Sequence, residues 1–410
     1  MFVCFTCLIL KTRGTLSNCT SILNAAGIIL VILPLINTGV YKLKEISACQ
    51  YIKTTQKTSD NIIDSEKKEI LPDIYYIIFD RYSDTRTLKQ IYDFDNSRFI
   101  DYLKNKGFYI ASNSTANYTK TEHSLASSLN MEYINYLSDK LGQDSNNWLP
   151  LYAKLQDYRV WRILKSKGYK FIHFGTYYGP TSRNKYADSN VILYPLLNEF
   201  AVTLYKKTAL YPVTLYFNVF DPRFLQYRRV LYKFDKLAEV AKVKEPTFVF
   251  AHMITPHPPY VFDRNGSFLS AKQDSERNRK GKYTDQLFFI NKKISELIER
   301  LLSVSEIPPI IILQSDEGTY PARYRADVNA FQWDKATDFE LKEKMRILNA
   351  YYLPGIEKDA LYSSITPVNS FRIVFNLYFN SDFALLPDEN FAFTDTRHPY
   401  KFINITNKIR

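Results

Sequence analysis

The hydrophobic pattern of this chain changes once, near residue 45. From residue 22 to 41 no charged residue interrupts the apolar run, and about twenty residues is the length that a helix needs to cross a bilayer. Residues 45–71 are mostly polar. From residue 72 onward, short apolar runs alternate with stretches in which apolar residues recur at helical spacing. The pattern predicts a membrane anchor at 1–44, a juxtamembrane linker at 45–71 and a soluble domain at 72–410.

A cleavable signal peptide is the alternative for the first apolar run. The run is long for a signal peptide and has no small-residue cleavage pattern before Tyr41, so we expect an anchor with its span at about 22–41. Lys11 and Arg13 precede the span and several lysines follow it. This distribution slightly favours a cytoplasmic position for the large domain.

The alternating pattern of the soluble domain predicts an α/β protein with a mostly parallel sheet. Helical patterns end at Gly107 and Gly168, and an apolar run follows each glycine, so we expect two similar helix-to-strand units. A longer helix is expected over Asp285–Leu302, and a late one from Pro367 with Thr366 as its N-cap. Strands are predicted at 74–80, just after Gly107, and at 169–174, 246–254, 308–315 and 347–355.

Composition narrows the chemistry of this domain. All four cysteines lie at positions 4, 7, 19 and 49, so a metal in the rest of the chain needs oxygen and nitrogen ligands. The net charge of +12 favours an anionic partner. No glycine-rich phosphate-binding loop and no nucleic-acid recognition module is legible, so neither nucleotide nor nucleic-acid binding is expected. The Tyr-rich segment at about 177–244 shows no clear pattern, and we expect an insertion that shapes a pocket.

Acidic and histidine side chains follow the ends of three predicted strands. Asp80 closes the first strand, His257 follows a later one, and Asp316 with Glu317 closes the strand at 308–315. In open parallel sheets ligands bind beyond the carboxyl ends of the strands, so these residues should converge on one edge. Two adjacent carboxylates after a buried strand are costly unless a cation or a catalytic role compensates them.

The segment NYTKTEHSLASSLN, residues 117–130, turns from loop into helix and places Thr119 and Thr121 at the start of that helix. A hydroxyl there can act as a nucleophile, because the helix dipole and a nearby metal would stabilise its alkoxide. The alternative is a capping box, in which a threonine caps the helix and a glutamate three or four residues later completes the motif. The sequence leaves both interpretations open.

Taken in order, these segments resemble the sulfatase-like hydrolase/transferase group of the alkaline phosphatase superfamily. The resemblance covers about residues 72–405 and is carried by Asp80 after an apolar strand, then NYTKT, AHMITPHPPY, QSDEG and LNAYYLPG. The chain is especially similar to membrane-anchored relatives of lipoteichoic acid synthase and to phosphoethanolamine transferases. The resemblance implies an alkaline-phosphatase-like α/β/α sandwich with a mostly parallel central sheet and one divalent metal ion.

The same resemblance implies roles for individual residues. Thr121 would be the catalytic nucleophile, and the metal would be bound by Asp80, Thr121, Asp316 and Glu317. Three histidines are candidates for substrate binding: His257, His252 and His173. His252 lies inside a predicted strand, so a satisfied core histidine is the alternative there.

The chain departs from the family pattern in two places. The family usually has an Asp-His pair where this chain has Asp316 and Glu317. A carboxylate in place of an imidazole favours Mn, Mg or Ca over Zn, and it could equally mark a lost activity. The chain also lacks the Cys/Ser-x-Pro-x-Arg run from which sulfatases of this superfamily make their nucleophile, so phosphoryl transfer is favoured over sulfate ester hydrolysis.

These expectations describe a sulfatase-like enzyme that is anchored in the cell membrane. It would be a divalent-metal-dependent phosphotransferase or phosphodiesterase that acts on anionic lipid headgroups or glycans of the cell envelope. The resemblance places the catalytic domain outside the cytoplasm, against the slight preference of the flanking charges. The alternatives are a catalytically inactive domain that binds anionic envelope polymer, and a sulfuric ester hydrolase.

Overall fold

The computed structural model describes residues 17–56, 71–216 and 221–409, in two units that divide between Ser59 and Asp60. The first unit contains helix α2 (Ser17–Gln56). Its segment Thr20–Lys44 has a mean hydropathy of 2.0 and is not buried, so by length and composition it can cross a membrane. The predicted span lies inside this segment, and the helix continues into the first part of the expected linker. Residues 1–16 of the expected anchor and 57–70 of the expected linker lie outside the described residues.

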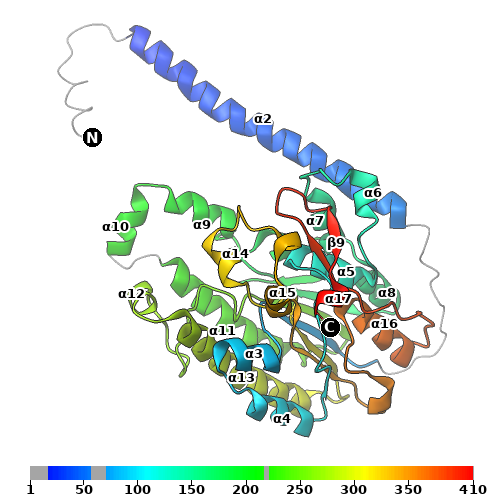
Figure 1. Cartoon of the computed structure of the whole chain (residues 1–410). Coiled ribbons are helices and arrows are strands. Elements are labelled where there is room, and N and C mark those ends of the chain that lie inside the picture. The colour runs from blue at the N-terminus through cyan, green and yellow to red at the C-terminus, as the bar shows by residue number, and fades with distance from the viewer. Residues whose placement is uncertain (1–16, 57–70, 217–220, 410) are drawn as a thin grey trace. The chain divides into compact units, whose positions relative to one another are not determined.

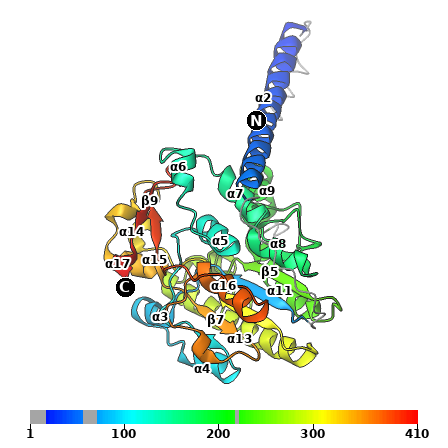
Figure 2. The ribbon, with the colours of Figure 1, turned by 90° about the vertical axis from the view of Figure 1, so that its right-hand side faces the viewer.

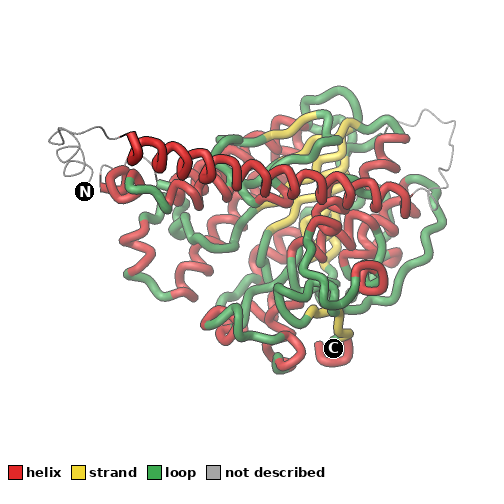
Figure 3. Tube along the Cα trace, turned by 90° about the horizontal axis from the view of Figure 1, so that it is seen from above, coloured by secondary structure: helices red, strands yellow, loops and turns green. Residues whose placement is uncertain are grey.

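The second unit is built on a seven-stranded sheet with the strand order β2-β7-β6-β1-β5-β3-β4. β1 pairs in parallel with β5 on one side and with β6 on the other, whereas β7 runs antiparallel to β2 and β6. The mostly parallel sheet that the sequence predicts is confirmed, and Figure 3 shows its strands between helices. The strands are β1 (Ile74–Phe79), β2 (Tyr109–Ile110), β3 (Lys170–Phe174), β4 (Ser189–Val191), β5 (Thr247–Met253), β6 (Ile310–Gln314) and β7 (Asn349–Tyr352).

Helices cover both faces of this sheet and form a hydrophobic core with each face. The side chains of β1 alternate between these two cores. Tyr75, Ile77 and Phe79 enter the first core, with the helices α3, α4, α11 and α13. Ile74, Tyr76 and Ile78 enter the second core, with α5, α7, α8 and α16 (Figures 1 and 2). These helices are α3 (Thr85–Tyr92), α4 (Ser97–Asn105), α5 (Thr121–Asn130), α7 (Leu149–Gln156), α8 (Arg159–Ser166), α11 (Pro222–Val240), α13 (Arg279–Val304) and α16 (Pro367–Tyr378).

Shorter elements surround this sandwich. The Tyr-rich segment contributes β4, α9, α10 and α11, and its residues 217–220 lie outside the described part of the chain. The short elements are η1 (Gly179–Thr181), α6 (Leu137–Leu141), α9 (Glu199–Lys206), α10 (Leu210–Tyr216), α12 (Ala271–Ser275), α14 (Ala322–Ala326), η2 (Trp333–Lys335), α15 (Asp338–Met345), η3 (Lys358–Ala360), α17 (Thr406–Ile409) and a two-stranded sheet of β8 (Phe391–Phe393) and β9 (Phe402–Asn404).

The two predicted helix-to-strand units end their helices in the same way. Gly107 after α4 and Gly168 after α8 have φ angles of +93° and +87°. The N–H of Phe108 donates to the carbonyl of Leu103 at 3.0 Å, and the corresponding bond after α8 measures 3.1 Å. This is the Schellman motif, which favours glycine because its left-handed residue has no Cβ to clash. The predicted glycine stops are confirmed.

Candidate metal centre and cavity

Three buried side chains from adjacent strands converge at the carboxyl edge of the sheet. Asp80 follows β1 directly, Asp316 lies just past β6, and His252 is part of β5. His252 Nε2 is 4.0 Å from Asp80 Oδ2 and 4.0 Å from Asp316 Oδ2. The strand order brings them together, because Ile78 of β1 is in register with His252 on one side and with Gln314 on the other.

Each of these three side chains has one buried atom without a hydrogen-bond partner. Asp80 Oδ1, Asp316 Oδ2 and His252 Nε2 are all buried and accept or donate no hydrogen bond. Each such atom loses its hydration without compensation unless a ligand or water takes the place of a protein partner. The three side chains offer ligand atoms within 4.8 Å of one another, and imidazole and carboxylate are ordinary ligands of divalent ions. The residues present therefore fit a metal site.

His252 has the chemical form that a metal ligand needs. Burial, and then the nearby Lys233, lower the pKa of His252 well below its ordinary value, so the imidazole is neutral. Its Nδ1 lies 2.9 Å from Thr181 Oγ1. When the Nδ1 proton is donated to this hydroxyl, the lone pair on Nε2 faces the two aspartates.

The two aspartates carry a charge that their surroundings disfavour. Burial, and then repulsion by Asp316, raise the pKa of Asp80 well above its usual range. Burial, and then repulsion by Glu317, raise the pKa of Asp316 to about 7, and the nearby Thr121 hydroxyl acts in the opposite direction. A divalent cation between the carboxylates would favour the ionised form of both.

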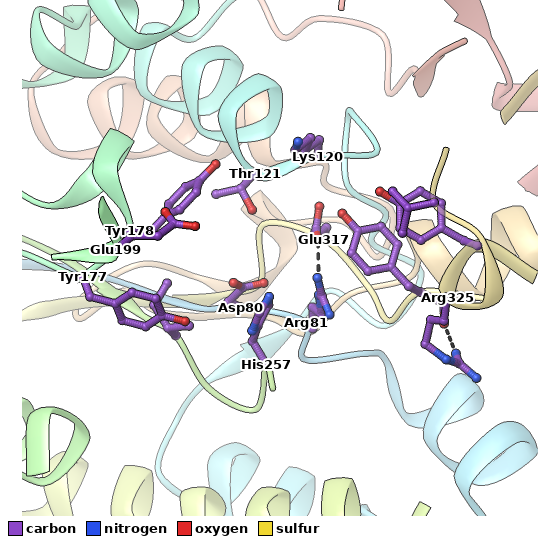
Figure 4. Close-up of a pocket in the computed structure, with 14 residues that line it drawn as sticks. Asp80, Arg81, Lys120, Thr121, Tyr177, Tyr178, Glu199, His257, Glu317 and Arg325 are labelled. Carbon is purple, nitrogen blue, oxygen red and sulfur yellow. Dashed lines mark hydrogen bonds and ion pairs between the residues drawn. The ribbon is translucent and has the colours of Figure 1, made fainter. Parts of the chain in front are cut away.

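Thr121 is the first residue of α5 and lines the cavity beside Asp80 (Figure 4). Lys120 is the N-cap of this helix and makes no side-chain cap bond, so the capping box that the sequence also allowed is not formed. Thr119 is buried and is not among the described residues that line the cavity. Of the two threonines, Thr121 is the one that lines the cavity.

Glu317 is neutralised by cations of the chain itself. Its Oε1 lies 2.7 Å from Lys344 Nζ and 3.5 Å from Arg81 Nε. Lys344 is fully buried, and both cations lie over the ring of Tyr320, with Lys344 Nζ 3.4 Å and Arg81 Cζ 4.1 Å from its centroid. Glu317 Oε2 has no hydrogen-bond partner. The structure therefore pairs Glu317 with an ammonium, and the nitrogen ligand of the cluster comes from a different strand.

Gly318 allows this pairing. Its N–H donates to the carbonyl of Lys344 at 2.7 Å, which holds the loop after β6 against α15. A Cβ at this position would lie only 2.4 Å from the carbonyl oxygen of Glu343, so no other residue fits without a backbone shift. The glycine after the two carboxylates thus fixes the distance between Glu317 and Lys344.

The cluster opens into a cavity of about 480 Å³. Arg81 contributes its guanidinium to the wall from a left-handed backbone conformation, φ 65°, which is uncommon for a residue with a Cβ. Figure 4 shows Lys120 above the cavity and Tyr178 beside Thr121. The wall combines three kinds of side chain: basic Arg81, Lys120 and Arg325; acidic Asp80, Glu199 and Glu317; and aromatic Tyr177, Tyr178, Tyr320 and Tyr324.

His257 and His173 take different positions. His257 lines the cavity, and its backbone N–H donates to the carbonyl of Asp80 at 3.1 Å. Burial, and then Arg81, lower the pKa of His257 well below its ordinary value. His173 is buried in β3 and is not among the described residues that line the cavity. Its Nε2 lies 3.0 Å from the carbonyl of Thr181, so His173 supports the threonine that orients His252.

Sequence reasoning does not find Lys344 or Thr181. Lys344 belongs to a charged helix, and its one signal is the spacing: it lies three residues after Leu341, which is buried on the same helix. Thr181 belongs to a 3₁₀ turn in the Tyr-rich segment, where no pattern is legible. Both residues act through neighbours that are distant in the sequence.

Comparisons with known proteins bear on the fold. No protein-family model matches the sequence, and no curated protein matches it significantly. The C-terminal periplasmic domain of EptC from Escherichia coli is similar in structure, with 13% identity, 83% of this chain and 94% of that chain covered, and a TM-score of 0.51. The same domain in complex with Zn gives a TM-score of 0.52 at the same identity and coverage.

The corresponding domain of the phosphoethanolamine transferase EptC from Campylobacter jejuni gives 11% identity, 77% and 92% coverage and a TM-score of 0.47. At these identities the likeness to the Escherichia coli domain concerns the fold alone. It confirms the fold that the sequence predicts, an alkaline-phosphatase-like α/β/α sandwich with a mostly parallel central sheet.

Proposed function

We propose that this domain is a divalent-metal-dependent phosphotransferase or phosphodiesterase with Thr121 as its nucleophile. The observation that carries the proposal is the position of Thr121, which is the first residue of α5 and lines the cavity beside Asp80. It lies beside a buried cluster in which each of three side chains has an atom without a hydrogen-bond partner. A hydroxyl at a helix N-terminus beside a cation site suits attack on an anionic ester.

The metal would be held by Asp80, His252 and Asp316, with Thr121 beside them. When bound, a divalent ion lowers the pKa of a nearby hydroxyl and polarises a phosphoryl oxygen. In this proposal His252 takes the place that the sequence analysis gives to Glu317 among the metal ligands, because Glu317 is paired with Lys344. One imidazole with two carboxylates suits Mn and Zn as well as the harder ions, so the reason for placing Zn last no longer applies.

Arg81 and His257 are the groups that we assign to the phosphoryl oxygens of the substrate. Both line the cavity beside Asp80, and the Arg81 guanidinium stays charged. Guanidinium groups bind phosphate through two parallel hydrogen bonds, which fixes orientation as well as charge. Lys120, the residue before Thr121, adds a second positive charge at the mouth of the cavity.

The chemistry takes two steps. In the first, Thr121 Oγ bonds to the phosphorus of a phosphodiester and its proton goes to water. The bond from phosphorus to the donor alcohol breaks, and the alcohol leaves with a proton from water. In the second, the oxygen of an acceptor hydroxyl or of water bonds to the phosphorus of the phospho-threonine, the bond from phosphorus to Thr121 Oγ breaks, and the proton lost by the acceptor returns through water to Thr121 Oγ.

We infer that the substrate is an anionic lipid or glycan of the cell envelope and that the domain lies outside the cytoplasm. The helix Thr20–Lys44 can keep the domain at a membrane, and the domain of similar fold from Escherichia coli is periplasmic. The tyrosines of the cavity wall suit contact with sugar rings or headgroups.

The test uses the full-length chain in detergent, with metal content measured beside turnover of a bis-aryl phosphodiester and of an aryl sulfate. We expect one ion per chain, lost in Asp316→Ala, and phosphodiester turnover at least about a thousandfold lower in Thr121→Ala. Thr119→Ala is the matched control, since Thr119 lies two residues away and does not line the cavity. Equal turnover in Thr121→Ala and the unchanged chain would remove Thr121 from the mechanism.

An inactive, polymer-binding domain is the second candidate, and the observation that favours it is the Lys344 ammonium on Glu317. In the same experiment this candidate predicts a folded chain without turnover under any ion. Turnover of the aryl sulfate but not of the phosphodiester would instead support the sulfuric ester hydrolase.

A further inference from the structure

The helices α9 and α10 expose apolar side chains that the rest of the domain leaves uncovered. α9 contains no buried residue, although every other described helix of eight or more residues in the second unit does. The two helices are linked by 207–209 (Figure 1). Five apolar side chains on this hairpin and just before it are exposed by the following fractions: Leu196 85%, Phe200 75%, Leu204 57%, Leu210 64% and Val213 49%.

The base of this hairpin is fixed to the domain. Asn198 caps α9 through its side chain, which accepts a hydrogen bond from Ala201 N at 2.9 Å. The N–H of Glu199 donates to the carbonyl of Tyr177 at 2.8 Å, and the guanidinium of Arg229 donates to the carbonyl of Leu197. Helices of this length are not stable alone in water, so these contacts set the direction in which the apolar side chains point.

The hairpin begins at the wall of the cavity. Glu199, the first residue of α9, lines the cavity together with Tyr177 and Tyr178, and Figure 4 shows these three on the side of Thr121 away from Arg325. Whatever covers Phe200 and Leu204 is therefore next to the entrance of the candidate active site.

A lipid bilayer fits this surface better than a protein does. The same chain carries the helix Thr20–Lys44, which can hold the domain beside a membrane. Lys206 and Lys207 are exposed at the end of α9, so the surface combines apolar side chains with positive charge, as interfacial helices do on anionic lipid. Contiguous exposed apolar side chains mark an interaction site, whereas single ones are ordinary.

We propose that the hairpin α9–α10 docks on the anionic lipid surface of the bilayer that anchors the chain and holds the cavity entrance at the level of the headgroups. This inference deepens the proposed function, because it makes the phosphodiester donor a lipid taken directly from the bilayer. That part of the inference rests on the proposed function. The docking itself depends on the surface alone.

The test places a tryptophan on the hairpin of the full-length chain. Phe200→Trp is reconstituted in phosphatidylcholine vesicles with and without phosphatidylglycerol, with lipids brominated along the acyl chain as quenchers. We expect stronger quenching than the three natural tryptophans give in the unchanged chain, and more with phosphatidylglycerol present. Leu385→Trp is the matched control, because Leu385 is an exposed leucine, 46%, outside the hairpin.

Quenching that is equal in Phe200→Trp and Leu385→Trp would overturn the docking. A dimer in detergent that Leu204→Ser dissociates would also overturn it, because a second copy would then cover the surface.

A second measurement separates docking from catalysis. In the variant with both Leu204→Ser and Leu210→Ser, turnover of a lipid donor in vesicles should fall on the order of tenfold, while turnover of a soluble bis-aryl phosphodiester stays unchanged. A fall in both rates would contradict the docking role. If the unchanged chain turns over neither donor, the proposed function fails, and the quenching result still decides the docking.

Discussion

Lys344 is a lysine without exposed surface whose charge is stabilised by one carboxylate and one aromatic ring. Burial lowers the pKa of Lys344 to about 8, and the attraction of Glu317 opposes this shift. The side chain therefore stays mostly charged at neutral pH. Removing either Glu317 or Lys344 leaves the other as a buried charge without its partner. Such a charge lowers the stability of the folded state by more than the intact pair raises it.

We therefore expect Lys344→Met to reduce the free energy of unfolding by about 3–5 kcal/mol, since among the described residues it leaves only Arg81 as a cation close to Glu317. Lys342→Met in the same helix is the control, because Lys342 is half-buried. Adding Glu317→Gln to Lys344→Met should restore part of the loss. Urea unfolding followed by circular dichroism measures all three. A Lys344→Met chain as stable as Lys342→Met would show that the pair is not required.

Asp73 provides a pH test away from the cavity. Its Oδ1 accepts hydrogen bonds from N and Oγ1 of Thr247, both at 2.8 Å, and burial nevertheless raises its pKa above the ordinary value. A raised folded-state pKa means that the folded state binds the proton more tightly, so this carboxylate lowers stability as pH rises above about 4. Asp73→Asn keeps an acceptor without the charge, and should be more stable than the unchanged chain at neutral pH.

That advantage should shrink as the pH of the unfolding experiment is lowered toward about 4. Asp95→Asn is the control with the opposite sign, because hydrogen bonds from Ser97 lower the pKa of exposed Asp95. A stability difference for Asp73→Asn that does not change with pH would contradict the account.

At the scale of elements, the contact between the loop after β6 and α15 sets the shape of the site. Gly318→Ala would put a Cβ 2.4 Å from the carbonyl oxygen of Glu343 and 2.8 Å from that of Lys344. Both atoms are backbone, so α15 must move away, and we expect a loss of about 1–3 kcal/mol together with reduced metal binding. Gly179→Ala is the control, because its Cβ meets nothing within 4 Å. Unchanged unfolding and metal content in Gly318→Ala would show that α15 is free to shift.

Local sequence patterns predict the helices and strands themselves. They do not predict which of these elements lie side by side in the fold. Apolar runs, glycine stops and the Pro367 start of α16 are features of a few consecutive residues, and each appears where the sequence predicts it. The sequence leaves His252 open between a substrate contact and a core residue, because the alternating pattern of a buried strand does not show which residues lie beside it. Only the order β6-β1-β5 reveals that it faces two aspartates. The sequence predicts Glu317 as a metal ligand and does not show that Lys344 lies against it.

At the scale of the whole molecule, a bound ion should appear as stability. A ligand that binds only the folded state at a hundred times its Kd adds about 2.7 kcal/mol. We expect a chelator to lower the Tm of the full-length chain, and re-addition of Mn or Zn to restore it. Asp80→Asn should make the Tm insensitive to both treatments, since Asp80 belongs to the cluster. A Tm that the chelator leaves unchanged in the wild-type chain would argue against a resident ion.

The pairing of Glu317 with Arg81 and Lys344 also sets the net charge of the site, and this net charge bears on which substrate the site prefers. Around the cluster itself, Asp80, Asp316 and Glu317 are three acidic side chains, and Arg81 and Lys344 are the two basic side chains paired with Glu317. With all three carboxyl groups ionised, the net charge of these five side chains is minus one, and one divalent ion changes it to plus one. A phosphodiester, with its single negative charge, then makes the loaded site neutral, whereas a phosphomonoester dianion leaves an uncompensated charge in a poorly solvated space. Because Lys344 already compensates Glu317, one divalent ion is enough for the site to prefer phosphodiesters over phosphomonoesters.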